Sequence, residues 1–298
     1  MKRISQINAE GLLVITTVVW GSTFFMIKLL LTDGSENSPF ALLTARFIIA
    51  TVLAFFLFTP KKFPDKTELI GGLIIGIAAL CGYACQTVGL VYTTAAKSGF
   101  ITSLFVIFVP FLSRIWEKKK IPINIYIALL PAALGLWAIS GAGKSIMLIN
   151  IGDKITLLSA ISFAFQVVGI QVYTSKCSWK WLTILQFATV AAGSGIGLLF
   201  ENPVVLSTTA SNLLGITYLG IIASAGALGV QMFAQRFTTS ARASFIYITE
   251  PIFAALFAWI FIGLGMNSIE LLGTGAIFIS IIIGRITSDT KGSDKNRQ

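Results

Sequence analysis

The sequence consists almost entirely of apolar runs about 20 residues long, separated by short polar segments. A run of this length is what an α-helix needs to cross the hydrocarbon core of a bilayer. Only 11% of the residues are charged, against roughly 25% in soluble domains. The sequence therefore predicts an all-α integral membrane protein in a lipid bilayer. Its ten predicted transmembrane helices lie at about 10–32, 39–58, 68–90, 97–116, 123–142, 153–174, 180–200, 211–234, 242–263 and 267–286.

The distribution of basic residues supports this helix count. With a cytoplasmic N-terminus, 17 of the 22 Lys and Arg residues fall in cytoplasmic segments. Lys97, Lys144 and Lys154 fall on the opposite side, and Lys28 and Arg46 lie within predicted spans. We therefore expect a multi-pass protein of the cell (inner or plasma) membrane with both termini cytoplasmic. The net charge of +10 follows from this bias, so no nucleic-acid partner is expected.

Residues 91–117 and 236–262 resemble each other when they are aligned at an offset of 145 residues. The matched pairs are Tyr92/Phe237, Thr93/Thr238, Thr94/Thr239, Ala96/Ala241, Lys97/Arg242, Phe100/Phe245 and Ile101/Ile246. Because each half holds five helices, the second half is inverted relative to the first. We expect two inverted five-helix repeats, 1–145 and 146–287, and a disordered cytoplasmic tail, 288–298. Such repeats place a substrate site near the bilayer midplane, between the halves.

Four stretches carry a recognisable family pattern. They are Trp20-Gly21-Ser22 with Phe24 and Lys28, then Arg46, then GLVYTTAAKSGFITSLFVIFVP from Gly89 to Pro110, and EPIFAALFAWIFIG from Glu250 to Gly263. Over about residues 10–286 the chain resembles the EamA-type ten-helix permeases of the drug/metabolite transporter superfamily. The resemblance implies a secondary transporter, most often an exporter of amino acids or other small metabolites. Such permeases usually have a Glu where this chain has Leu264, so no role of that acid is carried over.

Glu250 and Arg46 are the main charged candidates for a substrate-binding site. Glu250 is a carboxylate well inside a predicted span, where an ionised group must face a cavity, pair with a cation or take up a proton. It either binds a substrate amine or a proton, or is a structural acid beside Pro251. Arg46 lies about eight residues into its helix and either attracts a substrate carboxylate or bridges helix carbonyls.

Polar and amphipathic side chains within other spans complete the candidate set. A wet midplane cavity would give them hydrogen-bond partners, although each could instead bridge two helices. The remaining substrate-binding candidates are Trp20, Tyr83, Gln86, Thr102, Gln166, Gln231 and Tyr247.

Enzymatic and cofactor chemistry is not expected. The chain has no His, and its three Cys residues lack the spacing of a metal site, so no cofactor, metal or catalytic residue is predicted. The predicted function is a secondary active transporter that moves small polar metabolites by alternating access, with amino-acid export as the first choice. The alternative is an importer or exchanger of a larger metabolite, such as a nucleotide-like or S-adenosyl compound. Protons are the candidate coupling ion, and a monomer or weak homodimer is expected.

Overall fold

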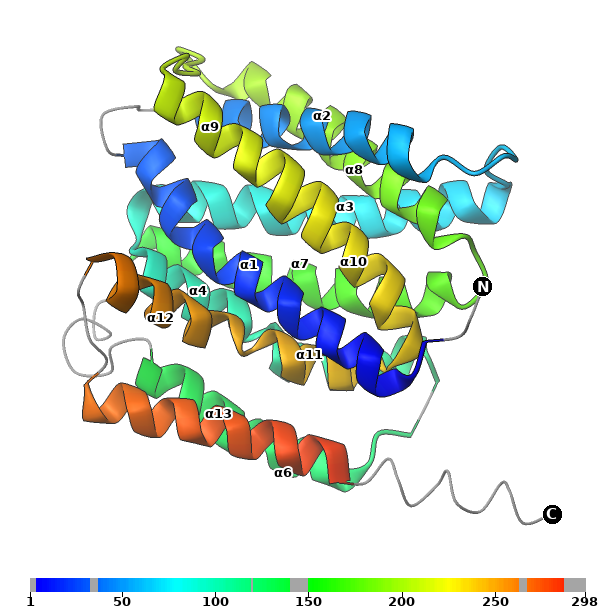
Figure 1. The fold of residues 1–298 in the computed structure, drawn as a ribbon, viewed down its shortest axis with the longest axis vertical. Helices are drawn as coiled ribbons and strands as arrows, with labels where there is room; N and C mark the ends of the chain where they lie inside the picture. The colour runs from blue at the N-terminus through cyan, green and yellow to red at the C-terminus, as the bar shows by residue number, and fades with distance from the viewer. Residues whose placement is uncertain (1–3, 33–36, 119, 140–149, 263–266, 287–298) are drawn as a thin grey trace.

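The computed structural model describes residues 4–32, 37–118, 120–139, 150–262 and 267–286, and these residues are almost entirely helical (Figure 1). The first repeat contains α1 (Gln6–Thr32), α2 (Pro39–Phe58), α3 (Lys66–Tyr92), α4 (Ala95–Ser103), α5 (Phe105–Trp116) and α6 (Ile123–Ile139). The second contains α7 (Ile151–Thr174), α8 (Trp179–Gly197), η1 (Leu198–Phe200), α9 (Ala210–Tyr218), η2 (Leu219–Gly226), α10 (Ala227–Ala234), η3 (Gln235–Phe237), α11 (Ser240–Tyr247), α12 (Glu250–Ile262) and α13 (Ser268–Ile286).

These helices form the ten predicted spans. Among the described residues, seven helical stretches are long and apolar enough to cross a membrane. Three of them, Ala95–Trp116, Trp179–Phe200 and Ala210–Phe237, combine consecutive elements. The shorter apolar helices α6 and α13 supply two more spans, and α11 with α12 forms the tenth. The all-α, ten-helix prediction is therefore confirmed.

Contacts between the halves follow the inverted repeat. In one half, α3 packs against α7, and the equivalent contact in the other half is α10 against α1. Likewise, α5 packs against α7, and the equivalent contact is α12 against α1. The pairs α2–α8 and α6–α13 each join equivalent helices of the two repeats. In Figure 1 the helices run from side to side, and α1 begins at the same end of the bundle at which α13 ends.

The fourth helix of each repeat is broken at the same position. The first break is at Leu104, between α4 and α5, and the second is at Ile248 and Thr249, between α11 and α12. At the offset of 145 residues, the first residues of α4 and α5 align with those of α11 and α12. The break is therefore a feature of the repeat, and Ile248 and Thr249 at the second break are buried.

Glycines allow the closest helix contacts, as the spacing Gly72-x-x-x-Gly76 predicts. A Cβ atom built on Gly76 would lie 2.5 Å from Thr189 Cβ on α8. A Cβ atom built on Gly152 would lie 2.6 Å from the carbonyl oxygen of Gly89, where α7 meets α3. The predicted repeat boundary at 145/146, the tail 288–298 and Leu264 lie outside the described residues.

Candidate functional site

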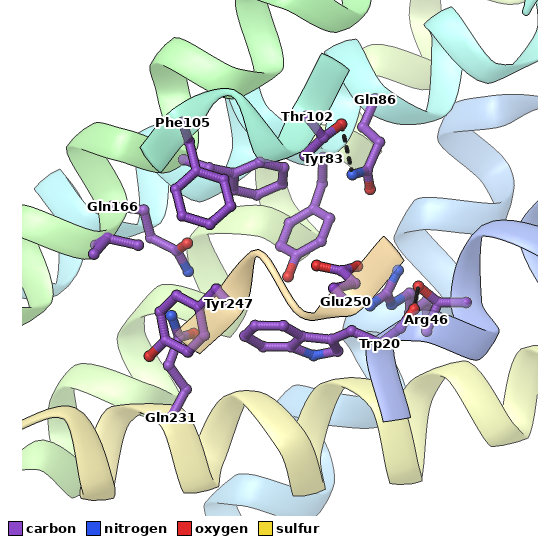
Figure 2. A pocket seen from close by; sticks show the side chains of 13 residues that line it. Trp20, Arg46, Tyr83, Gln86, Thr102, Phe105, Gln166, Gln231, Tyr247 and Glu250 are labelled. Atoms are coloured by element: carbon purple, nitrogen blue, oxygen red, sulfur yellow. Dashed lines mark hydrogen bonds between the residues drawn. The ribbon is translucent and has the colours of Figure 1, made fainter. Parts of the chain in front are cut away.

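One cavity between the two halves collects every site residue predicted from the sequence (Figure 2). Its volume is about 50 Å³, and its walls come from both repeats. The predicted residues that line it are Trp20, Arg46, Tyr83, Gln86, Thr102, Gln166, Gln231, Tyr247 and Glu250. The lining residues come from the first, second, third, fourth, sixth, eighth and ninth transmembrane helices, and the second helix supplies Arg46.

Arg46 is buried, and its orientation is fixed by the opposite half. Its Nε donates to Ser224 Oγ at 2.6 Å, and its guanidinium lies 5.0 Å from the centre of the Tyr83 ring. Ser224 belongs to η2, a π-helical segment of the eighth span. Among the described residues, no hydrogen bond or short ion pair engages the two Nη groups of Arg46. These groups form a planar pair of donors suited to a carboxylate.

Glu250 is the first residue of α12 and lies directly after the break in the ninth span. A helix N-terminus favours a negative charge, which makes this a suitable position for a carboxylate. In the part of the chain that the structure describes, no residue donates a hydrogen bond to the Glu250 carboxylate, so the structural alternative gains no support from these contacts. Figure 2 shows this carboxylate beside the Arg46 side chain, with the Tyr83 ring pointing toward both.

Aromatic rings form much of the remaining wall. The Trp20 ring lies 5.5 Å from the Tyr247 ring, and its Nε1 donates to the Ala223 carbonyl at 3.3 Å. The Tyr247 hydroxyl donates to Gln235 Oε1 at 3.0 Å. This bond anchors the phenol group, and Tyr247 lines the cavity in contact with Trp20 and Phe105.

Amide side chains add polar groups to the same wall. Gln86 Nε2 donates to Thr102 Oγ1 at 3.3 Å. Gln166 Nε2 and Gln231 Oε1 are buried and have no hydrogen-bond partner among the described residues. Unpaired buried polar atoms are costly, so their presence at a cavity indicates a polar ligand or water.

The sequence did not identify four of the lining residues, which are Thr23, Phe105, Phe163 and Val167. For Phe105 a signal existed, because the offset of 145 residues aligns it with Glu250. Phe163 could not be distinguished from the other 22 Phe residues, most of which suit a bilayer or a core equally well. Within the described ranges, no three His, Cys, Asp or Glu side chains lie close enough to hold a metal ion.

Comparison with known proteins places this architecture in a family. The EamA-like transporter family matches the chain twice, over residues 8–141 and 150–284. A protein of Archaeoglobus fulgidus described as an uncharacterized transporter is 31% identical over 281 residues, which cover 94% of this chain and 86% of the relative. The uncharacterized inner membrane transporter YedA of Escherichia coli K12 is 24% identical, with 92% of this chain and 89% of YedA covered.

A solved crystal structure shares the fold. Its TM-score is 0.76 at 12% sequence identity, and the match covers 94% of this chain and 96% of the other. At that identity the likeness concerns the fold alone. The two family matches and the relatives agree with the inverted repeats, and the chain belongs to the EamA-like transporter family.

Proposed function

We propose that this transporter exports amino acids across the cytoplasmic membrane by alternating access. The observation that carries the proposal is the relationship between Arg46 and Glu250. Both line the same cavity, and no hydrogen bond or short ion pair from a described residue engages the Glu250 carboxylate or the Arg46 Nη groups. One positive and one negative group in a shared cavity suit a substrate that carries both charges.

The charges argue for a zwitterion in particular. A buried charge is costly unless an opposite charge compensates it, and Arg46 and Glu250 supply opposite charges in the same cavity. An amino acid would place its carboxylate on Arg46 and its ammonium group on Glu250, leaving the total charge of the cavity unchanged. Each contact would be a charge-assisted hydrogen bond, the stronger class of hydrogen bond in proteins.

The rings and amides suit the rest of such a substrate. Trp20, Tyr83, Phe105, Phe163 and Tyr247 offer apolar surface to an aliphatic or aromatic side chain. Gln166 and Gln231 add the unpaired amide groups described above. A site that is mostly apolar with a few convergent polar groups is typical of small-molecule binding.

The size of the cavity favours a carrier. Its volume of about 50 Å³ is small beside the roughly 300–1,000 Å³ of typical small-molecule pockets. An amino acid enters only if the walls move apart, which fits an occluded state of an alternating-access cycle. A nucleotide-like or S-adenosyl compound, the alternative cargo, would need a larger movement.

The remaining parts of the proposal concern orientation, coupling and assembly. The basic-residue bias supports cytoplasmic termini, and the similarity to an inner membrane transporter supports the cytoplasmic membrane. Protons are the proposed coupling ion, with Glu250 as the group that takes them up. We propose repeats at residues 1–145 and 146–287, a cytoplasmic tail at 288–298, and a monomer or weak homodimer.

Counterflow in proteoliposomes tests this function. The vesicles are preloaded with one unlabelled compound, an amino acid or a nucleotide-like metabolite, and uptake of the same labelled compound is followed. Transient accumulation of aliphatic or aromatic amino acids is the expected result. Exchange confined to nucleotide-like compounds would support the alternative cargo instead, and simple leakage without counterflow would contradict the carrier mechanism.

A further inference from the structure

Two ion pairs join the repeats outside the cavity. Lys97 Nζ lies 2.6 Å from Asp153 Oδ2, and Arg242 Nη1 lies 3.5 Å from Glu10 Oε1. Lys97 and Arg242 are equivalent at the offset of 145 residues. Each basic residue lies near the start of the fourth span of its own repeat, and each acid lies near the start of the first span of the other repeat.

The surroundings of the two basic residues repeat as well. Thr94 Oγ1 and Thr239 Oγ1 accept from the backbone N–H of Lys97 and Arg242, each at 3.2 Å.

The preceding threonines donate hydrogen bonds to the two acids. Thr93 Oγ1 donates to Asp153 Oδ1 at 2.7 Å, and Thr238 Oγ1 donates to Glu10 Oε1 at 3.2 Å. Both of these Thr pairs are related by the same offset. The inverted repeat therefore preserves a whole cluster, in which a basic residue and two threonines meet an acid of the other half.

The two clusters lie at opposite ends of the bundle. In Figure 1, α4 and α7 begin at one end, whereas α1 and α11 begin at the other. From each cluster a short helix runs inward to the cavity, where α4 contributes Thr102 and α11 contributes Tyr247. The breaks at Leu104 and Ile248 follow these short helices and give each a point at which its direction can change.

We propose that these two ion pairs control access to the cavity, with Lys97–Asp153 closing one entrance and Arg242–Glu10 closing the other. The inference rests on the alternating access proposed above. The side chains of Asp153 and Glu10 are only 4% and 8% exposed, so separating either pair would leave a charge without its partner in a nearly dry place. Separation therefore requires water to enter, and the entry of water at that end opens the cavity there.

The two pairs differ in length and in the hydrogen bonds that surround the acid. Lys97–Asp153 is the shorter pair, and Asp153 is also held by a capping box in which the Asn150 N–H donates to Asp153 Oδ2 at 2.9 Å. Glu10 Oε1 accepts from Gln6 Nε2 at 3.0 Å as well as from Thr238.

Sided labelling of one cysteine in the cavity tests the proposal. The reporter is V167C, a lining position outside the proposed charged contacts, in a background with Cys81, Cys85 and Cys177 replaced by Ala. A charged, membrane-impermeant methanethiosulfonate is applied to sealed right-side-out and inside-out vesicles. A separate variant that retains only Cys177, which lies between α7 and α8, identifies the face at the Arg242 end.

Two neutral variants give the expected pattern. D153N keeps an oxygen that can cap α7 but removes the charge, and it should raise labelling several-fold from the Lys97 face alone. E10Q should raise labelling several-fold from the Arg242 face alone. The double swap K97D/D153K restores an ion pair with reversed charges and should lower labelling again.

E270Q is the matched control for D153N. Asn267 and Glu270 cap α13 in the same manner, with the Asn267 N–H donating to Glu270 Oε2 at 2.9 Å, and no described basic residue pairs with Glu270. A role in helix capping alone predicts equal effects of the two variants, whereas the proposal predicts an effect of D153N only. Unchanged labelling in both D153N and E10Q, or a rise from both faces in either, would overturn the proposal.

The labelling needs no substrate, so it separates the two proposals. Normal amino-acid counterflow with unsided labelling would reject the ion-pair control and leave the proposed function intact. Sided labelling without amino-acid counterflow would reject the proposed substrate and support the ion-pair control.

Discussion

Glu250 occupies in the second repeat the position that Phe105 occupies in the first. Each is the first residue of the helix after the break, and both line the cavity. An inverted repeat with identical halves would give the cavity two equal ends. The exchange of a ring for a carboxylate gives the cavity an acid beside Arg46 without a second acid at the equivalent position, which would give the proposed zwitterion one preferred orientation.

Replacing Glu250 by Gln should weaken binding of substrates with an ammonium group. A hydrogen bond to a charged group contributes about 1.5–3 kcal/mol, so the half-saturating concentration in counterflow should rise by about 10–150-fold. E270Q, which removes a carboxylate from the first turn of α13, a helix that contributes no lining residue to the cavity, should leave that concentration unchanged. An unchanged value in E250Q, with and without a proton gradient, would assign Glu250 a structural role.

Replacing Arg46 by Lys should weaken binding although the positive charge is kept. Lys lacks the planar pair of Nη donors, which we call the fork, and it lacks the Nε that donates to Ser224. The variant therefore loses both the fork and the hydrogen bond that orients the side chain. S224A removes the orienting bond alone and should have a smaller effect in the same concentration series. If S224A were as damaging as R46K, the fork itself would not be the source of affinity.

Replacing Phe105 by Ala should widen the cavity. Its ring centre lies 6.3 Å from that of Tyr247, and its loss leaves room for a larger substrate side chain. We expect the preference among amino acids, measured by competition in counterflow, to move toward those with bulky side chains. F56A is the control, because Phe56 is 79% exposed on the outer surface and its loss should leave the preference as it was.

The contact between α6 and α13 should depend on Gly273. A Cβ atom built there would lie 2.6 Å from Ala138 Cβ and 2.8 Å from the Gly135 carbonyl oxygen, whereas one built on Gly275 would meet nothing within 4 Å. G273A should lower stability by about 1–3 kcal/mol through overpacking. G275A, on the same helix, should be neutral or slightly stabilising, since Ala is the better helix former. Thermal unfolding in detergent measures both, and equal midpoints would contradict the packing of these helices.

Much of the fold could be predicted because a bilayer leaves few alternatives. Apolar runs give the spans, and the match of residues 91–117 with 236–262 gives the repeat. The candidate residues that line the cavity were predicted for a related reason, since polar groups such as Gln166 inside a span need partners or a cavity.

Other features were not predictable from the sequence. The span predicted at 242–263 contains two helices, α11 and α12. The sequence did not reveal the break, because the apolar residues around Ile248 suit one continuous helix equally well. The π-helical segment η2, which presents Ser224 to Arg46, leaves no mark in composition either. The ion pair of Glu10 with Arg242 joins residues far apart in sequence, and only the packing of α1 against α11 brings them together.

The most direct test of the account uses analogues that carry one charge. Leucine, its decarboxylated amine 3-methylbutylamine and its deaminated acid 4-methylpentanoate are compared as inhibitors of leucine counterflow in the wild type, E250Q and R46K. The account predicts that E250Q weakens inhibition by leucine and the amine but not by the acid, and that R46K weakens inhibition by leucine and the acid but not by the amine. Equal weakening of all three compounds by both variants would contradict the assignment of the ammonium group to Glu250 and the carboxylate to Arg46.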